Sequence, residues 1–148
     1  MKRILNKDFD ERQLKIRGAV YLHTLIVMVL LILVNAFLRM NGVVWADELY
    51  QALLLIMVPV TVGSVELICK DAYIGVRRSY GAMILLLGLC GIVGFFPPLF
   101  SILSGKDGFV VNGAFTSDGQ RMMVSFCCLI ISSVFVARYF YERHQQGE

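Results

Sequence analysis

Hydrophobic residues along this 148-residue chain gather into four long runs, over residues 18–38, 49–69, 81–103 and 122–141. The first and third runs contain no Asp, Glu, Lys or Arg, and the second contains one, Glu66. A helix rises about 1.5 Å per residue, so it needs about 20 apolar residues to cross a hydrocarbon layer of roughly 30 Å. The pattern therefore predicts an all-α, polytopic membrane protein with four transmembrane helices.

The loops between the runs are short, so we expect one membrane domain over residues 1–148. A cleaved signal peptide is the alternative interpretation of the first run. Such a peptide has a short apolar core followed by a small-residue cleavage site. This run is longer and ends in Leu38, Arg39 and Met40, so we expect it to be retained as a span.

The charged arm before the first run, residues 1–17, predicts a short amphipathic helix over residues 6–17 on the cytoplasmic face. Its first turns are rich in acids, which the helix dipole favours. Phe9 and Ile16 give it a thin apolar stripe. A partner-docking surface and a solvated charged lead-in are the two interpretations. The candidate partner-docking residues are Asp10, Glu11 and Arg12.

Basic residues are biased to one side of the predicted membrane. Of the 14 lysines and arginines, all but Arg39, Lys106 and Arg121 lie in the arm, the middle loop or the C-terminal tail. Cytoplasmic loops carry the excess of positive charge, so we expect both termini to be cytoplasmic and the protein to lie in the cytoplasmic membrane. This bias and attraction to anionic lipid explain the net charge of +3 without a nucleic-acid partner.

Three ionisable residues form a candidate intramembrane polar site: Glu66, Lys70 and His23. A carboxylate inside a span is costly to bury and by default suggests a function. Lys70 follows Glu66 at i,i+4, so a structural pair at the headgroup level is the competing interpretation. His23 would be explained by a proton role or by an interhelical hydrogen bond. The sequence does not show whether His23 faces Glu66.

Prolines and a turn signal mark the irregular positions. Pro59 predicts a kink in the second run, and Pro97-Pro98 predicts that the regular helix of the third run ends before them. In the following loop, Asn112-Gly113 between two apolar segments predicts a two-residue β-hairpin. An isolated hairpin is marginally stable, so the membrane surface or a partner has to support it.

Small residues recur at helical spacing on the third and fourth runs, where they let helices approach closely in lipid. We expect them to pack inside the bundle, and a homodimer interface is the alternative. They are Gly88, Gly91 and Gly94 on the third run, and Ser125, Cys128 and Ser132 on the fourth.

Motifs for catalysis or cofactor binding are not found in this sequence. The four cysteines lie in apolar runs without C-x-x-C spacing, and the two histidines are far apart. We therefore expect neither thiol redox chemistry nor a metal site. The sequence contains no phosphate-binding glycine motif and no nucleophile elbow, so we also expect no cofactor and no enzymatic activity.

Short motifs in the N-terminal half resemble a known group of proteins, the small uncharacterised multi-span proteins of Gram-positive bacteria. The resemblance implies a four-helix integral membrane protein, of a family often encoded beside small DNA-binding regulators and without an established activity. The motifs are Asp10-Glu11-Arg12-Gln13 before the first span, and Glu66-Leu67-Ile68 leading into Tyr73-Ile74-Gly75.

The function predicted from these observations is that of a non-enzymatic integral membrane protein, an accessory or regulatory partner in the cytoplasmic membrane. Its partner in the bilayer would be another membrane protein or a second copy of this chain. The alternative is a small oligomeric transporter that uses Glu66. Small four-span multidrug exporters are the natural comparison, but they carry their essential carboxylate in the first span, whereas Glu66 lies in the second.

Overall fold

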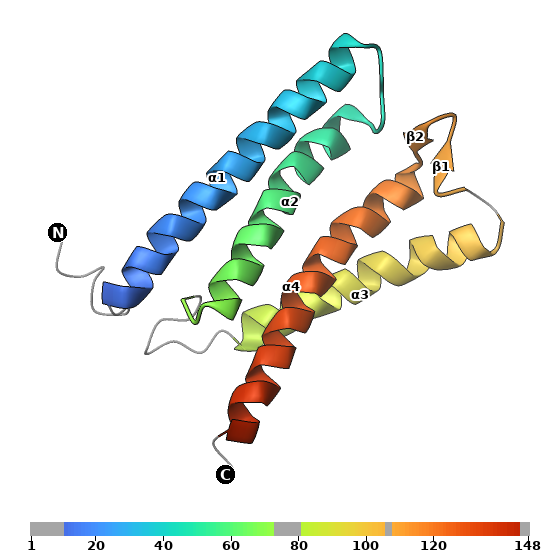
Figure 1. Ribbon diagram of the computed structural model, residues 1–148. Coiled ribbons are helices and arrows are strands. Elements are labelled where there is room, and N and C mark those ends of the chain that lie inside the picture. Colours follow the sequence, from blue (N-terminus) through green and yellow to red (C-terminus); the bar gives the residue numbers. More distant parts are fainter. Residues whose placement is uncertain (1–10, 73–80, 106–107, 146–148) are drawn as a thin grey trace.

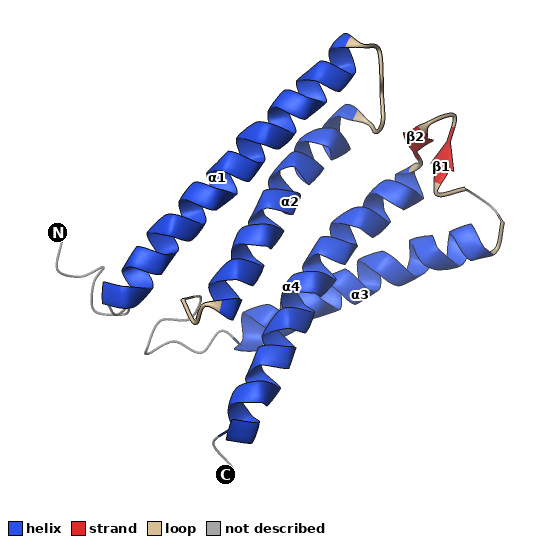
Figure 2. Ribbon diagram, in the orientation of Figure 1, coloured by secondary structure: helices blue, strands red, loops and turns tan. Residues whose placement is uncertain are grey.

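Four long helices and one small hairpin make up the structure, a computed structural model that describes residues 11–72, 81–105 and 108–145. All four helices are long and apolar enough to cross a membrane, as the sequence predicts. The helices are α1 (Glu11–Met40), α2 (Glu48–Cys69), α3 (Gly81–Leu103) and α4 (Ser117–Gln145), and the strands are β1 (Val110–Val111) and β2 (Ala114–Phe115) (Figure 1 and Figure 2).

The helices pack in the spatial order α1, α2, α4, α3, so α1 and α3 are the outer members (Figure 1). The helix α1 rests mainly on α2, and α3 rests mainly on α4. At one end of the molecule α1 and α3 begin while α2 and α4 end. We call this the basic end, because Arg12, Lys15, Arg17, Lys70 and Arg138 lie there. The opposite end, with the α1–α2 turn and the β1–β2 hairpin, is the hairpin end.

The predicted amphipathic arm is not a separate helix, so this prediction is wrong for the part that can be compared. Residues 11–17 form the start of α1, which continues unbroken into the apolar span, and residues 1–10 lie outside the described residues. A helix that ended at Arg17 would leave its last carbonyls unpaired, whereas continuing it adds a hydrogen bond for each residue. Gly18 does not interrupt this helix.

The start of α4 also differs from the prediction, because the helix begins at Ser117 and not at residue 122. Thr116 precedes it as an N-cap, since its Oγ1 accepts a hydrogen bond from the backbone N–H of Gly119 at 3.2 Å. A Cβ at Gly119 would lie 2.5 Å from the carbonyl oxygen of Phe109, so only glycine fits at this turn. The cap and this glycine therefore set an earlier start than the apolar run suggests.

The prolines do not break the helices, contrary to the end of regular helix predicted at Pro97-Pro98. The helix α3 runs through both to Leu103, and α2 is continuous through Pro59. Each proline removes one backbone hydrogen bond, but irregular backbone exposed to hydrocarbon would leave more polar groups unpaired. At about 1.5 Å per residue, the 23 residues of α3 extend about 34 Å.

Glycines and serines hold α3 and α4 close together, which is the internal packing role predicted for them. A Cβ at Gly91 would lie 2.9 Å from side-chain atoms of Leu129 and 3.2 Å from its backbone nitrogen, so the helices can approach this closely only at glycine. Five of the six predicted small residues are therefore placed within the chain, and the facing pairs are Gly88 with Ser132, Gly91 with Leu129, and Gly94 with Ser125.

The predicted hairpin is present at the hairpin end. Asn112 and Gly113 have φ of 53° and 83°, the two positive values that a tight two-residue turn of this kind requires. The strands pair antiparallel with Val110 opposite Phe115. The α1–α2 turn supports the hairpin, because the carbonyl of Trp45 accepts a hydrogen bond from the Phe115 N–H at 2.8 Å.

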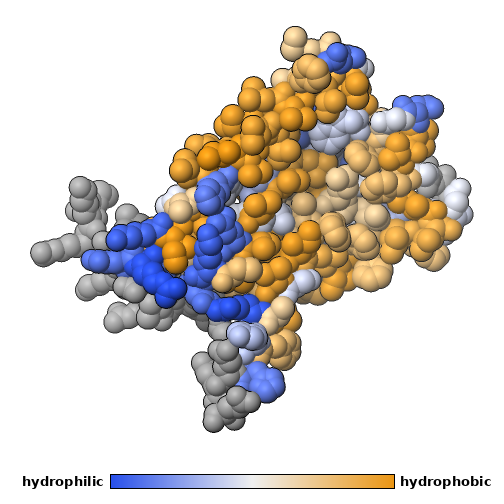
Figure 3. Space-filling view, in the orientation of Figure 1, coloured by the Kyte–Doolittle hydropathy of each residue, from blue (hydrophilic) through white to orange (hydrophobic). Residues whose placement is uncertain are grey.

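Apolar side chains cover most of the face in Figure 3, while hydrophilic side chains gather at the basic end and extend from it as a short strip. Within α1, Val20 is the buried residue. Large apolar side chains of this helix, such as Leu25, Leu33 and Phe37, are between 51% and 67% exposed. An apolar surface of this extent is unfavourable in water but suits a helix surrounded by hydrocarbon.

Candidate functional site

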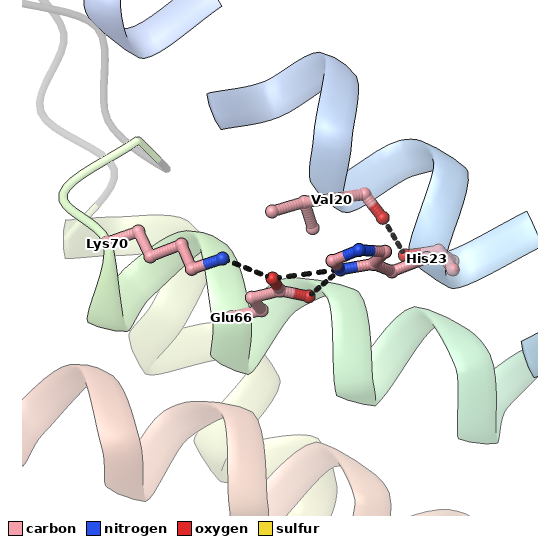
Figure 4. A network of polar contacts seen from close by, with 5 residues as sticks. Val20, His23, Glu66 and Lys70 are labelled. Atoms are coloured by element: carbon pink, nitrogen blue, oxygen red, sulfur yellow. Dashed lines mark hydrogen bonds and ion pairs between the residues drawn. The ribbon is translucent and has the colours of Figure 1, made fainter. Parts of the chain in front are cut away.

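Glu66 joins two helices at the basic end. Near the end of α2, its Oε1 accepts a hydrogen bond from Lys70 Nζ at 2.5 Å, in the predicted i,i+4 pairing. Its two carboxylate oxygens also lie 3.2 and 3.3 Å from Nδ1 of His23, on α1. Figure 4 shows the carboxylate between the other two side chains. The structure therefore answers the question that the sequence leaves open, because His23 and Glu66 face each other.

The contact between His23 and Glu66 needs one hydrogen between the two groups. An ionised carboxylate can only accept hydrogen bonds, so Nδ1 of His23 is the donor to an ionised Glu66. His23 lies about 9 Å along α1 from Arg17, and Glu66 lies about 6 Å along α2 from Lys70, at 1.5 Å per residue. The contact therefore lies at a similar depth on both helices, closer to the middle of the apolar spans than Arg17 and Lys70 are.

An apolar cluster and a close helix contact flank this pair of side chains. Val20, Leu67 and Ala72 form a buried cluster against which Ile16 packs, and this cluster lies toward the basic end. On the other side, Gly63 approaches the hydroxyl of Thr24 so closely that a Cβ there would collide with it. These contacts bring α1 and α2 together at the point where His23 meets Glu66.

The carboxylate of Glu66 has two nitrogen-bearing neighbours from two helices. They are Lys70 on its own helix and His23 on α1. The side chain of His23 is 55% exposed, compared with 21% for Glu66, so the imidazole is the more accessible side of this contact.

A second polar cluster at the basic end has no counterpart among the predicted sites. Its centre is the turn after α2, where the carbonyl of Asp71 accepts a bond from Gln13 Nε2 at 2.8 Å and that of Ala72 accepts one from Arg17 at 3.3 Å. Arg138 of α4 lies 2.5 Å from both carboxylate oxygens of Asp71. The turn that follows α2 thereby contacts two other helices, α1 and α4. In the sequence, Lys70-Asp71 has the pattern of an ordinary charged loop, so no local feature predicts that Asp71 contacts Arg138.

The predicted docking residues are only partly described. Asp10 lies outside the described residues, whereas Glu11 and Arg12 are exposed on the first turn of α1. Among the contacts that the structure describes for Glu66, which are those with Lys70 and His23, there is none to Glu11 or Arg12. Their role in binding a partner stays a prediction.

Comparison with known proteins gives no match from which a function could be inferred. No family model, no curated protein and no solved structure matches the chain. The resemblance to multi-span proteins of Gram-positive bacteria stays a prediction that rests on the short motifs around Glu11 and Glu66.

Proposed function

We propose that this chain is a non-enzymatic protein of the cytoplasmic membrane that acts as an accessory or regulatory partner of another membrane protein. The observation that carries the proposal is the placement of α1. It has one main neighbouring helix, α2, and Val20 is its buried residue. Many of its apolar side chains, such as Leu25, Leu33 and Phe37, are more than half exposed and are open to contact in the plane of the bilayer.

A helix exposed in this way is stable in lipid, and it is also suited to lateral association. Helices in hydrocarbon associate through packing and polar contacts, because burying apolar surface gains little there. With both termini in the cytoplasm, Glu11 and Arg12 would extend from the membrane beside this face. A partner could then contact the apolar side of α1 and these charges together.

Site-specific photo-crosslinking in cells tests this proposal. A photoreactive side chain at Leu25 on α1 should yield one discrete protein adduct, and the same group at Leu89 on α3 should yield lipid adducts only. The two positions are a matched pair, since they are 51% and 58% exposed. The charge reversals Glu11→Lys and Arg12→Glu should reduce the adduct at Leu25. Equal labelling from both positions, or lipid adducts alone, would contradict the proposal.

The contact between His23 and Glu66 favours a second candidate, a small proton-coupled transporter. Two ionisable groups from neighbouring spans meet at 3.2 Å, at similar depth and beside apolar residues. Such groups inside spans often belong to proton relays.

Vesicles that contain the purified protein and a trapped pH-sensitive dye test this second candidate. A transporter should dissipate an imposed pH gradient when an organic cation is added, and Glu66→Gln should abolish the effect while the helix content is unchanged. Thr61→Val provides a control on the same helix, because Thr61 hydrogen-bonds only to the backbone of its own helix among the contacts that the structure describes for its hydroxyl. If the pH gradient decays equally in vesicles with the wild-type protein, in vesicles with Glu66→Gln and in empty vesicles, the transporter hypothesis is refuted.

A further inference from the structure

Two neighbouring cations on the first turns of α1 have no acceptor in the part of the chain that the structure describes. Neither Arg12 nor Lys15 has an ion pair or a side-chain hydrogen bond there, and both residues are exposed. The other lysine and arginine side chains that the structure describes each bind a carboxylate or a backbone carbonyl. These bound cations are Arg17, Arg39, Lys70, Arg121 and Arg138. Arg12 and Lys15 are thus the described cations that remain available to an anion from outside the chain.

The charge around these two residues is positive. Residues 11–17 contain one carboxylate, Glu11, and the three cations Arg12, Lys15 and Arg17, so this stretch has a formal charge of +2. Arg12 and Lys15 are three positions apart, which places them side by side on the helix with about 5–6 Å between their Cβ atoms. Two cations at this spacing can bind the oxygens of a single phosphate group together.

The position of the two cations along α1 matches the headgroup region of a bilayer. Lys15 and Arg12 lie three and six residues before Gly18, where the apolar run begins, which is about 4.5 and 9 Å along the helix axis. The polar headgroup layer adds about 5–8 Å on each side of the hydrocarbon core. Long basic side chains extend along the helix surface, so both charges reach the level of the lipid phosphates.

The same face of α1 continues toward the hydrocarbon core as an exposed apolar surface. Leu22 and Ile26 follow Lys15 at i+7 and i+11, and this spacing puts the three residues on one side of the helix. Leu22 is 56% exposed and Ile26 is 48% exposed, so the neighbouring helices leave this side open. Figure 3 shows the same transition for the molecule as a whole, with hydrophilic side chains at the basic end directly beside apolar surface.

We propose that this face of α1 binds an anionic phospholipid, whose phosphate contacts Arg12 and Lys15 and whose acyl chain lies along Leu22 and Ile26. Such a lipid carries a negative charge and a hydrocarbon chain in the same order as the cations and the apolar residues on the helix. A zwitterionic lipid carries its own cation beside the phosphate, so it gains less from the two side chains. A soluble acidic segment would pair with the cations but leave the apolar residues uncovered. The inference does not rest on the proposed function, because lipid binding requires no partner protein.

Fluorescence quenching by labelled lipids tests this site on the full chain in nanodiscs of phosphatidylcholine. A fluorophore is attached to Ala19→Cys in a cysteine-free background, since Ala19 is exposed and lies between Lys15 and Leu22. Phosphatidylglycerol or phosphatidylcholine with a nitroxide on the acyl chain is then added at low mole fraction. Phosphatidylglycerol should quench with an apparent affinity at least about fivefold higher, because one cation near an anionic lipid contributes about this factor. Equal quenching by the two lipids would overturn the proposal.

Paired removal of charges locates the preference for phosphatidylglycerol. Arg12→Gln with Lys15→Gln should abolish it at unchanged helix content, because both residues are exposed. Arg39→Gln with Arg121→Gln is the matched control, which removes the same charge from the hairpin end and should leave the preference intact. A preference that persists without Arg12 and Lys15, or that is lost equally in the control, would refute the site. Inorganic phosphate at constant ionic strength should not displace the lipid; displacement would assign the two cations to a soluble anion and refute the lipid site.

Discussion

Asp71 is the residue at which a substitution tests the assembly of this fold most sharply. It follows the last turn of α2 with φ of 55°, in the left-handed region that normally favours glycine. The backbone N–H groups of Asp71 and Ala72 bond to the carbonyls of Ile68 and Leu67, which is the hydrogen-bond pattern of a helix that ends in a left-handed residue. The turns after α1 and α3 use Gly42 and Gly105 at the equivalent positions, with φ of 76° and 71°. These two turns suggest that Asp71 stands in a glycine position because its carboxylate binds Arg138.

This interpretation predicts unequal losses of stability for two substitutions that both remove the carboxylate. A non-glycine residue in the left-handed region costs roughly 1–2 kcal/mol. Glycine avoids this strain but loses about 0.4–1 kcal/mol through the freedom of its unfolded chain. Asp71→Ala should therefore be about 1 kcal/mol less stable than Asp71→Gly. Since an exposed ion pair contributes only about 0.2–1 kcal/mol, Asp71→Gly itself should differ little from the native protein.

The contribution of the ion pair is measured separately. Asp71→Asn keeps a residue that tolerates the left-handed region and removes the charge, so it should cost about 0.2–1 kcal/mol. The side chain of Asp71 is 60% exposed and that of Arg138 is 31% exposed, so the ion pair should contribute as little to stability as other solvent-exposed pairs do. Arg138 also lies over the ring of Tyr141, so Arg138→Gln alone should cost more. A double-mutant cycle of Asp71→Asn with Arg138→Gln isolates the pair itself.

The assay is equilibrium unfolding in mixed micelles of a mild detergent and sodium dodecyl sulfate, followed by circular dichroism. The wild-type protein and the variants Asp71→Gly, Asp71→Asn and Asp71→Ala are compared at one protein concentration. Equal stability of the glycine and alanine variants would refute the backbone argument. A coupling energy of zero in the double-mutant cycle would refute the argument that Arg138 explains why an aspartate stands here.

Three further predictions test other parts of the structure. Gly91→Ala should destabilise the protein by about 1–3 kcal/mol in the same unfolding assay, because the new methyl group would meet Leu129. Gly18 has open space around it, so Gly18→Ala should be neutral or stabilising by about 0.5–1 kcal/mol. Glu66→Gln should lower the melting temperature modestly and leave any flux unchanged if the carboxylate is structural, and flux lost at an unchanged melting temperature would contradict this. In a cysteine-free background, a single cysteine at Gly108 should react with an impermeant reagent from outside the cell and one in the α2–α3 loop should not; the reverse pattern would invert the predicted topology.

The local signals in the sequence were enough to predict the helices and the tightest turns. Four apolar runs with at most one charged residue each predict four helices, since helices leave no backbone group unpaired in hydrocarbon. Asn112-Gly113 predicts the hairpin, because both residues readily adopt positive φ. The errors fell where a local rule competed with longer-range context. The prolines at 97 and 98 did not end α3, and the charged arm did not separate from α1.

Only the tertiary structure decided which helices are neighbours and which polar groups meet. In lipid every span is apolar on most sides, so hydrophobic periodicity does not indicate which face of a helix packs and which faces hydrocarbon. The sequence could therefore supply His23 and Glu66 as candidates but could not pair them. Close approach at Gly63 brings their helices together. Asp71 shows the same limit, because its partner Arg138 lies 67 residues away and on a helix that only the packing order brings near.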